Sequence, residues 1–482
     1  MSVTVKHAPI AALLIASMLL FSCATEKAAV KTDAPPVGKT EPNKGEWSRI
    51  AFAEDLARLS NQGRWDEVFA LFDSVPQKEA ESADIGRLKL SMLISARQLD
   101  AATDTANDLE KRFPKDADIL YTRAVLAGAQ NNAGARKSYL DKTLAVDKNH
   151  SDAMAALGLD LVSLKNYKLA KTWLVKAVAA NPNNLDALFG LGRTYYMENE
   201  LDKARETMDL ALERDSSWSI LWAERARIRA EQNDVKGAIE DVKKACEIDG
   251  NIYSHWVDLG NYYITGFKKA EARDAFSRAI EIDGSQYLAY IYRAGLNDDL
   301  GNLDEAIADY RKVCEIFPNY HFAFESLGIL LWGKGDWQGS REAFRTALSY
   351  RPKNSSYALM TTLCFYREGK EKEAKEFMTK YLALLDRTTT EYFLCRLFVD
   401  LVGDADVLNR IMKEKNVNVR NRMLFYSAMY YQLFQSKSIA QKYFLEVISV
   451  PAPSFFEYRL SRWAITELEG TVREDTGRVS GT

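Results

Sequence analysis

Apolar and small residues recur along this chain at a fixed interval of 34 residues. Steps of 34 from Ala102 meet alanine at seven of nine positions, and the two exceptions are Arg136 and Ser340. A second ladder holds only apolar or aromatic residues: Leu140, Leu174, Met208, Val242, Phe276, Tyr310, Phe344 and Met378. A third holds Ala177, Ala211, Ala245, Ala279, Val313 and Ala347. Self-similarity at this period predicts stacked helical repeats, an architecture that usually presents a surface for holding other molecules.

Each 34-residue unit is predicted to be two antiparallel helices. Small residues on the first helix let the two backbones approach closely: Ala124, Gly158, Gly192, Ala226, Gly260, Ala294 and Gly328. Leu174, Phe276 and Phe344 are expected to fill the grooves between neighbouring hairpins. Glycines mark a left-handed turn inside the hairpin at positions 63, 301, 335 and 369. Prolines 114, 182, 318 and 352 are expected to stop the second helix.

The pattern within one unit resembles the tetratricopeptide repeat. Residues 151–184 carry Leu157-Gly158, Ala170, Leu174, Ala177 and Pro182 in the order typical of that repeat. The resemblance covers ten contiguous units over residues 49–388, about 70% of the chain. It implies an all-α fold: a right-handed superhelical solenoid of about 10–11 helix hairpins with a C-terminal capping helix region. Four residues depart from the repeat pattern, and Arg136 predicts looser stacking in its unit; the four are Val68, Arg136, Thr362 and Tyr381.

The solenoid is predicted to occupy residues 47–388, after which the period of 34 is lost. Residues 389–470 are predicted to hold a degenerate hairpin, one further repeat-like unit and a capping helix. The expected helices of the hairpin are 391–402 and 406–415, the extra unit is 421–453, and the closing helix is 455–468 with Trp463 on one face. Residues 471–482 are polar and are expected to be a frayed tail.

The first residues predict export from the cytoplasm. Residues 1–22 combine Lys6 with an apolar run that is too short to span a membrane, as in a signal peptide. The end of this run, Leu20-Phe21-Ser22-Cys23, resembles a bacterial lipobox, although Phe21 departs from its usual pattern. The resemblance implies that Cys23 is lipidated and becomes the mature N-terminus. The alternative is an ordinary signal peptide cut nearby, for example after Ala24.

A lipid on Cys23 would tether the protein to a membrane. Residues 23–46 are rich in alanine, lysine, threonine, glutamate and proline without an apolar period, which predicts a disordered tether. Acyl chains contribute about 0.8 kcal/mol per buried methylene, so a triacylated cysteine would hold firmly. In lipoproteins of enterobacterial type Ala24 favours the outer membrane, so we expect a lipid-anchored protein of the bacterial envelope, on its periplasmic or surface face.

Charge and residue usage argue against catalysis and nucleic-acid binding. The net charge is −3 on 131 charged groups, without the basic excess that a nucleic-acid site needs. Of the four histidines, His150, His255 and His321 lie in separate units, too far apart to share a metal. Cys246 and Cys314 are separated by a whole unit, which predicts buried thiols and no disulfide. We expect no enzyme activity, no cofactor, no metal site and no small-molecule substrate.

The resemblance implies that first helices line a concave groove, and that fixed places on them contact partners. By register those places include Phe189, Arg193, Tyr196, Arg227, Asn261, Trp332 and Tyr366. Arginine and aromatic residues often contribute most of the energy of an interface, so we hypothesise that this groove grips an extended or helical peptide. The alternative is that Phe189 and Tyr196 pack against the next helix and the arginines are solvated. No unit has the lysine–asparagine pair of the repeat subclass that clamps carboxyl termini.

Three functions fit the predicted anchor and groove. The first is a non-catalytic, membrane-anchored scaffold that binds protein partners or peptide segments in envelope assembly or secretion. The second is a surface-exposed adhesin that binds host or matrix proteins. The third is a regulatory subunit of an envelope enzyme. Self-association through the end units is compatible with all three, and the fold alone does not specify the partner.

Overall fold

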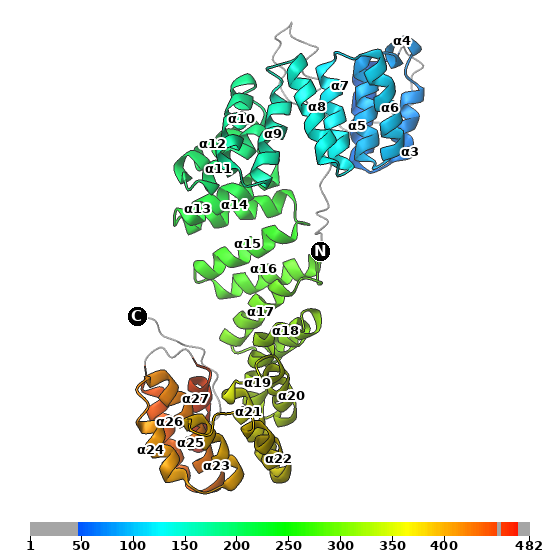
Figure 1. Ribbon diagram of the computed structural model, residues 1–482. Helices are drawn as coiled ribbons and strands as arrows, with labels where there is room; N and C mark the ends of the chain where they lie inside the picture. The colour runs from blue at the N-terminus through cyan, green and yellow to red at the C-terminus, as the bar shows by residue number, and fades with distance from the viewer. Residues whose placement is uncertain (1–46, 451–454, 471–482) are drawn as a thin grey trace, which may run out of the picture. The chain divides into compact units, whose positions relative to one another are not determined.

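The computed structural model describes residues 47–450 and 455–470, and within these residues the chain forms helices α2 to α27 and no strand (Figure 1). The all-helical prediction is confirmed. The predicted signal peptide, the lipid site at Cys23, the whole tether and the polar tail lie outside the described residues. The chain divides into two compact units, residues 1–232 and 233–482, and each is considered by itself.

Unit 1 holds twelve described helices, most of them in antiparallel pairs of 13 and 14 residues. They are α2 Arg49–Asn61, α3 Trp65–Asp73, α4 Gln77–Ala80, α5 Ala83–Ser95, α6 Leu99–Arg112, α7 Ala117–Ala129, α8 Ala133–Val146, α9 Ser151–Ser163, α10 Tyr167–Ala180, α11 Leu185–Met197, α12 Leu201–Arg214 and α13 Ser219–Glu231. The single-turn helix α4 is an addition that the repeat pattern does not predict.

Unit 2 continues the same pairs and ends in a different arrangement. Its described helices are α14 Val235–Ile248, α15 Tyr253–Thr265, α16 Lys269–Ile282, α17 Tyr287–Asp299, α18 Leu303–Ile316, α19 His321–Lys334, α20 Trp337–Tyr350, α21 Ser355–Arg367, α22 Glu371–Leu382, α23 Thr390–Asp400, α24 Asp404–Met412, α25 Val417–Phe434, α26 Lys437–Ile448 and α27 Glu457–Leu468. Helices α23 and α24 lie where the degenerate hairpin is predicted, α25 and α26 overlap the predicted extra unit, and α27 lies within the predicted closing helix.

The turns that follow the first helices share one backbone conformation. Gly63, Gly301, Gly335 and Gly369 have φ between +68° and +81°, as a left-handed turn requires. Six other residues at the same 34-residue register also have positive φ: Arg97, Asn131, Lys165, Asn199, Asn233 and Phe267. The second helices α6, α10, α18 and α20 each end two residues before a proline, as predicted.

The residue ladders lie in the core. All seven alanines of the first ladder and Ser340 are fully buried, and the Ser340 hydroxyl donates to the Gly328 carbonyl at 2.8 Å. Phe276 packs onto Gly260 of its own hairpin, where an added Cβ would lie 2.6 Å from the ring. The Phe276 ring also stacks on Tyr292 of the next first helix, with ring centroids 5.1 Å apart. The aromatic ladder therefore fills the space between hairpins, as expected.

Arg136 replaces alanine without leaving a buried charge unpaired. Its side chain is 24% exposed, and its Nε donates to the Asp160 carboxylate at 2.9 Å. The guanidinium lies beside Gly128, where an added Cβ would be 2.9 Å from Nη1. A glycine on α7 thus makes room for the long side chain on α8.

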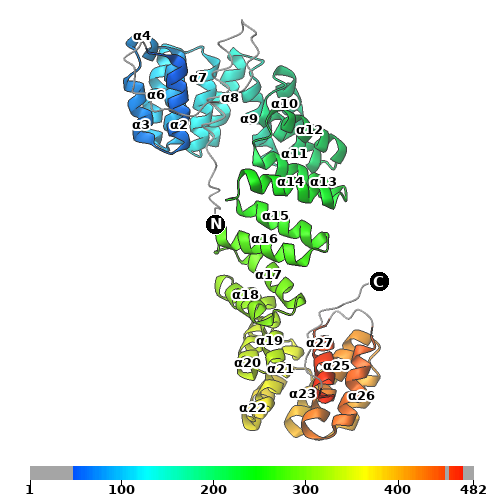
Figure 2. The same ribbon diagram turned by 180° about the vertical axis from the view of Figure 1, so that it is seen from behind.

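The last helices of unit 2 form a bundle beside the preceding repeats. In Figures 1 and 2, α27 lies between the pair α25–α26 and the repeat helices α19 and α21. Buried side chains from α20 to α27 form one continuous hydrophobic cluster, which includes Phe344, Leu363, Phe398, Tyr430 and Leu460. The closing helix therefore contacts earlier repeats as well as the last hairpin.

Candidate partner-binding face

We call the surface made by the first helix of each hairpin the first-helix face: α5, α7, α9, α11 and α13 in unit 1, and α15, α17, α19 and α21 in unit 2. Phe189 on α11 is only 8% exposed and packs against Trp218 with ring centroids 5.6 Å apart. The Arg193 guanidinium lies 5.4 Å from the centre of the Phe189 ring. Phe189 therefore serves as a buried platform for Arg193, as the packing alternative anticipated.

Arg193 and Arg227 are joined by a carboxylate that the sequence reasoning missed. Arg227 Nη1 donates to Glu224 Oε2 at 3.1 Å, and Arg193 Nε lies 3.7 Å from Glu224 Oε1. Glu224 is 8% exposed, whereas each arginine side chain keeps 40% of its surface in solvent. The two guanidiniums thus flank one buried carboxylate, which fixes their positions and leaves one net positive charge on the three groups.

Tyr196 lies next to this cluster. Burial raises the pKa of Tyr196, and the carboxylate of Glu231, which forms a side-chain hydrogen bond with the hydroxyl, raises it further. The nearby Arg227 acts in the opposite direction. Tyr196 is half-buried and neutral at physiological pH, so it can offer a phenol hydroxyl beside the two arginines.

The predicted site residues of unit 2 differ in accessibility. Asn261 on α15 is half-buried, and the Thr265 hydroxyl donates to its backbone carbonyl at 3.1 Å. Because Asn261 belongs to unit 2, only the two arginines of the predicted polar ladder are placed relative to each other.

Trp332 and Tyr366 require a correction, because both are packed inside unit 2. Trp332 is 5% exposed and meets Trp337 edge-on at 4.9 Å. The Tyr366 hydroxyl donates to the Phe398 carbonyl at 2.5 Å. Neither side chain is therefore presented to a partner in this conformation.

Asp118 and Asp152 occupy equivalent positions in successive repeats, and each forms a hydrogen bond with the next hairpin of unit 1. The His150 Nδ1 accepts from the Ala153 N–H at 3.2 Å and caps α9, while Nε2 lies 3.1 Å from Asp118. Because Nδ1 accepts, the proton of the neutral ring is on Nε2 and points to Asp118. Asn184 likewise donates to Asp152 at 2.7 Å. Among the described residues, no three His, Cys, Asp or Glu are placed to hold a metal ion.

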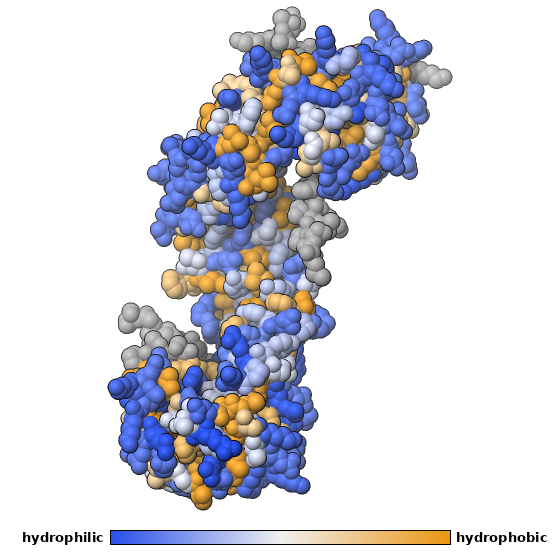
Figure 3. All heavy atoms as spheres, in the orientation of Figure 1, coloured by the Kyte–Doolittle hydropathy of each residue, from blue (hydrophilic) through white to orange (hydrophobic). Residues whose placement is uncertain are grey.

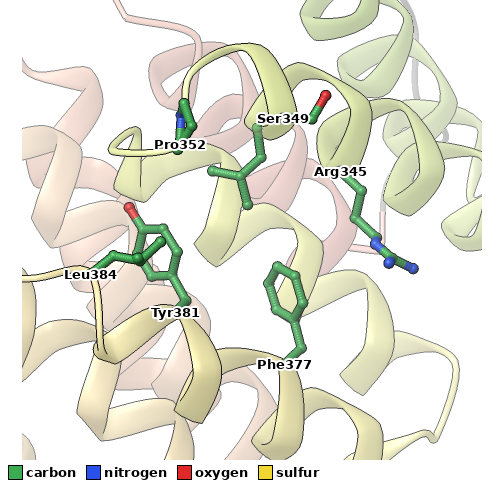
Figure 4. A pocket seen from close by; sticks show the side chains of 7 residues that line it. Arg345, Ser349, Pro352, Phe377, Tyr381 and Leu384 are labelled. Carbon is green, nitrogen blue, oxygen red and sulfur yellow. The ribbon is translucent and has the colours of Figure 1, made fainter.

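Two small surface pockets lie on unit 2. One of about 310 Å³ lies between α20 and α22, where Phe377 and Tyr381 face the helix that carries Arg345 and Ser349 (Figure 4). The other, of about 380 Å³, is lined by Trp256, Tyr263, Cys246 and several charged side chains. Burial raises the pKa of the Cys246 thiol to about 12, so it is protonated at neutral pH and is a poor nucleophile.

The face of the described residues seen in Figure 3 is largely hydrophilic. On the face shown in Figure 3, charged and polar residues cover most of both units, and hydrophobic residues appear in small separated patches. Within the described range, no helix has the length and apolar character needed to cross a bilayer. The four described cysteines, at positions 246, 314, 364 and 395, are free thiols in the structure.

Comparison with known proteins points to one class of repeat. Two family models, both described as Tetratricopeptide repeat, match residues 161–228 and residues 257–321 and 326–386. TPR repeat-containing protein MJ1428 of Methanocaldococcus jannaschii is 22% identical over 319 residues, which are 65% of this chain and 52% of that protein. Hsp70-Hsp90 organizing protein 3 of Arabidopsis thaliana is 24% identical over 125 residues, which are 26% of this chain and 22% of that protein.

The chain thus spans about half or less of the length of these curated relatives. A solved structure of pilF from Pseudomonas aeruginosa is 21% identical, covers 43% of this chain and 94% of that chain, and has a TM-score of 0.37. These similarities concern the repeat and say nothing specific about a ligand.

Proposed function

Because the matched helix pairs of this chain are tetratricopeptide repeats, we propose that it is a non-catalytic scaffold that binds a peptide segment of a protein partner on the first-helix face of unit 1. Repeats of this kind serve protein–protein interaction. The Arg193–Glu224–Arg227 cluster is the observation that carries the more specific proposal.

Three properties of this cluster support binding. Each arginine side chain keeps two-fifths of its surface exposed and pairs with Glu224, so less side-chain entropy is lost when a partner binds. The Phe189 ring below Arg193 adds an apolar support, and the Tyr196 hydroxyl adds a neutral hydrogen-bonding group. A segment with a carboxylate and backbone carbonyls matches the guanidinium donors of the two arginines.

Charge reversal tests this site. Arg193→Glu combined with Arg227→Glu is expected to abolish capture of partners by cross-linking in cells. The matched control is Arg205→Glu with Arg214→Glu, which reverses two exposed arginines on the second helix α12. Unchanged capture by the first variant would contradict the proposal.

A second variant guards against misfolding, because two new glutamates would face the buried Glu224. Arg193→Gln with Arg227→Gln removes both charges without adding any. Its circular dichroism and melting curve should resemble those of the wild type, and its partner capture should still be reduced.

We further propose that lipidated Cys23 holds the scaffold on a membrane of the bacterial envelope, where it acts in envelope assembly or secretion. This rests on the lipobox-like residues 20–23. Cys23→Ser should move the protein from the membrane fraction to the soluble fraction and prevent incorporation of labelled palmitate. A variant that stays on the membrane would refute the lipid anchor.

The surface-adhesin alternative is separated by protease treatment of intact cells. The scaffold proposal predicts that the repeats survive until the outer membrane is breached. Degradation in intact cells would place them outside and favour an adhesin. A regulatory role would appear as stable co-purification with an envelope enzyme at a defined stoichiometry.

A further inference from the structure

The closing helix α27 lies across three successive first helices of unit 2. It reaches Asp298 on α17, Gly333 on α19 and Arg367 on α21. Gly333 and Arg367 are 34 residues apart, so they occupy equivalent positions in successive repeats. Asp298 lies one residue before the equivalent position of the repeat that precedes them. Equivalent places on consecutive repeats therefore hold one helix, which is how a helical ligand would run along this face.

The contacts come from one side of α27. Arg459, Trp463 and Glu467 are spaced four residues apart, so they lie on one face of the helix. Both terminal nitrogens of Arg459 donate to the Asp298 carboxylate at 2.6 Å. At the other end, Arg367 donates to Glu467 at 3.2 and 3.3 Å.

The charges therefore fix the direction of the bound helix. Asp298 on α17 pairs with Arg459 near the start of α27. Arg367 on α21 pairs with Glu467 near the end of α27. The Asp298 side chain is 18% exposed and that of Arg367 is 17% exposed, whereas their partners Arg459 and Glu467 on α27 keep 33% and 39% of their surface in solvent. A helix bound in the opposite direction would place like charges together.

A slot without a side chain receives the central tryptophan. An added Cβ at Gly333 would lie 2.7 Å from Cζ3 of Trp463, so only glycine leaves room for this ring. The Arg459 guanidinium covers the same ring at 4.4 Å from its centre. The surface thus offers an acid, an aromatic slot and a base in that order.

The other face of α27 is bound to the C-terminal bundle. Leu460, Ala464 and Ile465 are at least 92% buried in the hydrophobic cluster of unit 2. The Glu457 carboxylate accepts from Tyr426 on α25 at 2.7 Å, and it also accepts from Ser356 on α21 at 2.6 Å. Trp463 and the two charged residues are therefore additional to the contacts that hold α27 in its own bundle.

From this geometry we propose that α17, α19 and α21 form a binding site for an amphipathic helix of a partner protein. That helix presents arginine, an aromatic ring and a carboxylate at four-residue spacing, and α27 is the occupant that it replaces. The inference rests on the proposed function, since it assumes that first-helix faces bind protein segments. It names the chemistry of the partner and the site in unit 2.

The experiment uses a labelled synthetic peptide of residues 455–470 and the full chain. Arg459→Glu with Trp463→Ala weakens the hold on α27 without changing the site. This variant is expected to bind the peptide at least about tenfold more tightly than the wild type, because loss of an aromatic or arginine anchor commonly costs this much or more. A peptide carrying the same two substitutions should not bind.

Two further variants locate the peptide. Gly333→Leu, added to the weakened chain, fills the slot and should abolish binding. Asp298→Arg, added to the same chain, should abolish binding of the unmodified peptide and permit binding of a peptide in which Arg459 is replaced by aspartate. Hydrogen exchange over α15–α22 must match the wild type in each case, which separates loss of binding from loss of fold.

Several results would overturn the proposal. It fails if the weakened chain, with its repeats protected from exchange, does not bind the peptide, or if Gly333→Leu leaves binding unchanged. It also fails if the wild type dimerises by exchanging α27 and Gly333→Leu prevents this, because the occupant would then be a second copy. The Arg193→Gln/Arg227→Gln substitutions are not expected to reduce peptide binding. A failure of the proposed site in unit 2 therefore does not contradict the proposed site in unit 1.

Discussion

The glycine ladder gives a sharp test of how the hairpins pack. Gly260 on α15 faces Phe276, and an added Cβ would lie 2.6 to 2.8 Å from three ring atoms. The ring is fully buried and stacks on Tyr292 of α17, so it has little room to move away. Gly295 on α17 provides the matched control, because its added Cβ would meet no atom within 4 Å.

Two contributions to local stability are expected, and only the first is common to Gly260→Ala and Gly295→Ala. Replacing glycine by alanine inside a helix stabilises it by about 1 kcal/mol, and this applies to both. Overpacking a well-packed core costs about 1–3 kcal/mol, and this applies only at Gly260. Gly295→Ala should therefore raise local stability by about 1 kcal/mol. Gly260→Ala should change it by about 0 to 2 kcal/mol in the unfavourable direction.

Hydrogen exchange is the suitable assay, because repeat arrays need not unfold in one cooperative step. The free energy of local opening should be measured for amides of α15 to α18 in both variants. The reasoning predicts that the variants differ by about 1–3 kcal/mol, with Gly260→Ala the less stable. Equal stabilisation by both substitutions would refute the claim that glycine is needed for contact with Phe276.

Three further predictions concern other parts of the chain. His150→Ala should cost about 1 kcal/mol of local stability and His150→Asn much less, because asparagine also caps helices. Burial lowers the pKa of His150, so the wild type should lose stability relative to His150→Asn as pH falls below the ordinary pKa of 6.5. Hydrogen exchange measured against pH tests this. Phe267→Gly should stabilise its left-handed turn by about 1 kcal/mol and Gly335→Ala should destabilise the equivalent turn by a similar amount, both read from thermal unfolding. Glu368→Ala should cost about 3 kcal/mol in chemical denaturation, because Arg341, whose side chain is 10% exposed, would lose its carboxylate partner. The corresponding structural role would be contradicted by a loss below about 1 kcal/mol for Glu368→Ala, by no pH effect at His150, or by unchanged melting of both turn variants.

The repeat architecture was predictable because its signal is carried by every unit. A single buried alanine such as Ala170 indicates little, but alanine at seven of nine equivalent positions indicates the same packing each time. The turns show where this reasoning falls short. Lys165 and Phe267 have the same positive φ as Gly335, although neither residue favours it. The packing of the two flanking helices imposes the turn and overrides the local preference.

The candidate site was only partly predictable, because its decisive contacts join residues on different helices. Register placed Arg193 and Arg227 on first helices, but not the carboxylate between them. The sequence did contain a sign of this carboxylate, because Glu224 is charged at the position where the preceding unit has Gly190. The pair Asp298–Arg459 joins residues 161 positions apart, and no repeat pattern relates them. The four-residue spacing of charged and aromatic residues on α27 was the available sign of a second bound face.

Partner binding on the first-helix face is the central claim, and site-specific photo-cross-linking in cells tests it most directly. A photoreactive residue should replace Tyr196 on α11 in one chain and Leu210 on α12, which is 45% exposed, in another. The account predicts covalent adducts with a partner protein from position 196 and none from position 210. Adducts from position 210 alone, or equally from both, would contradict it.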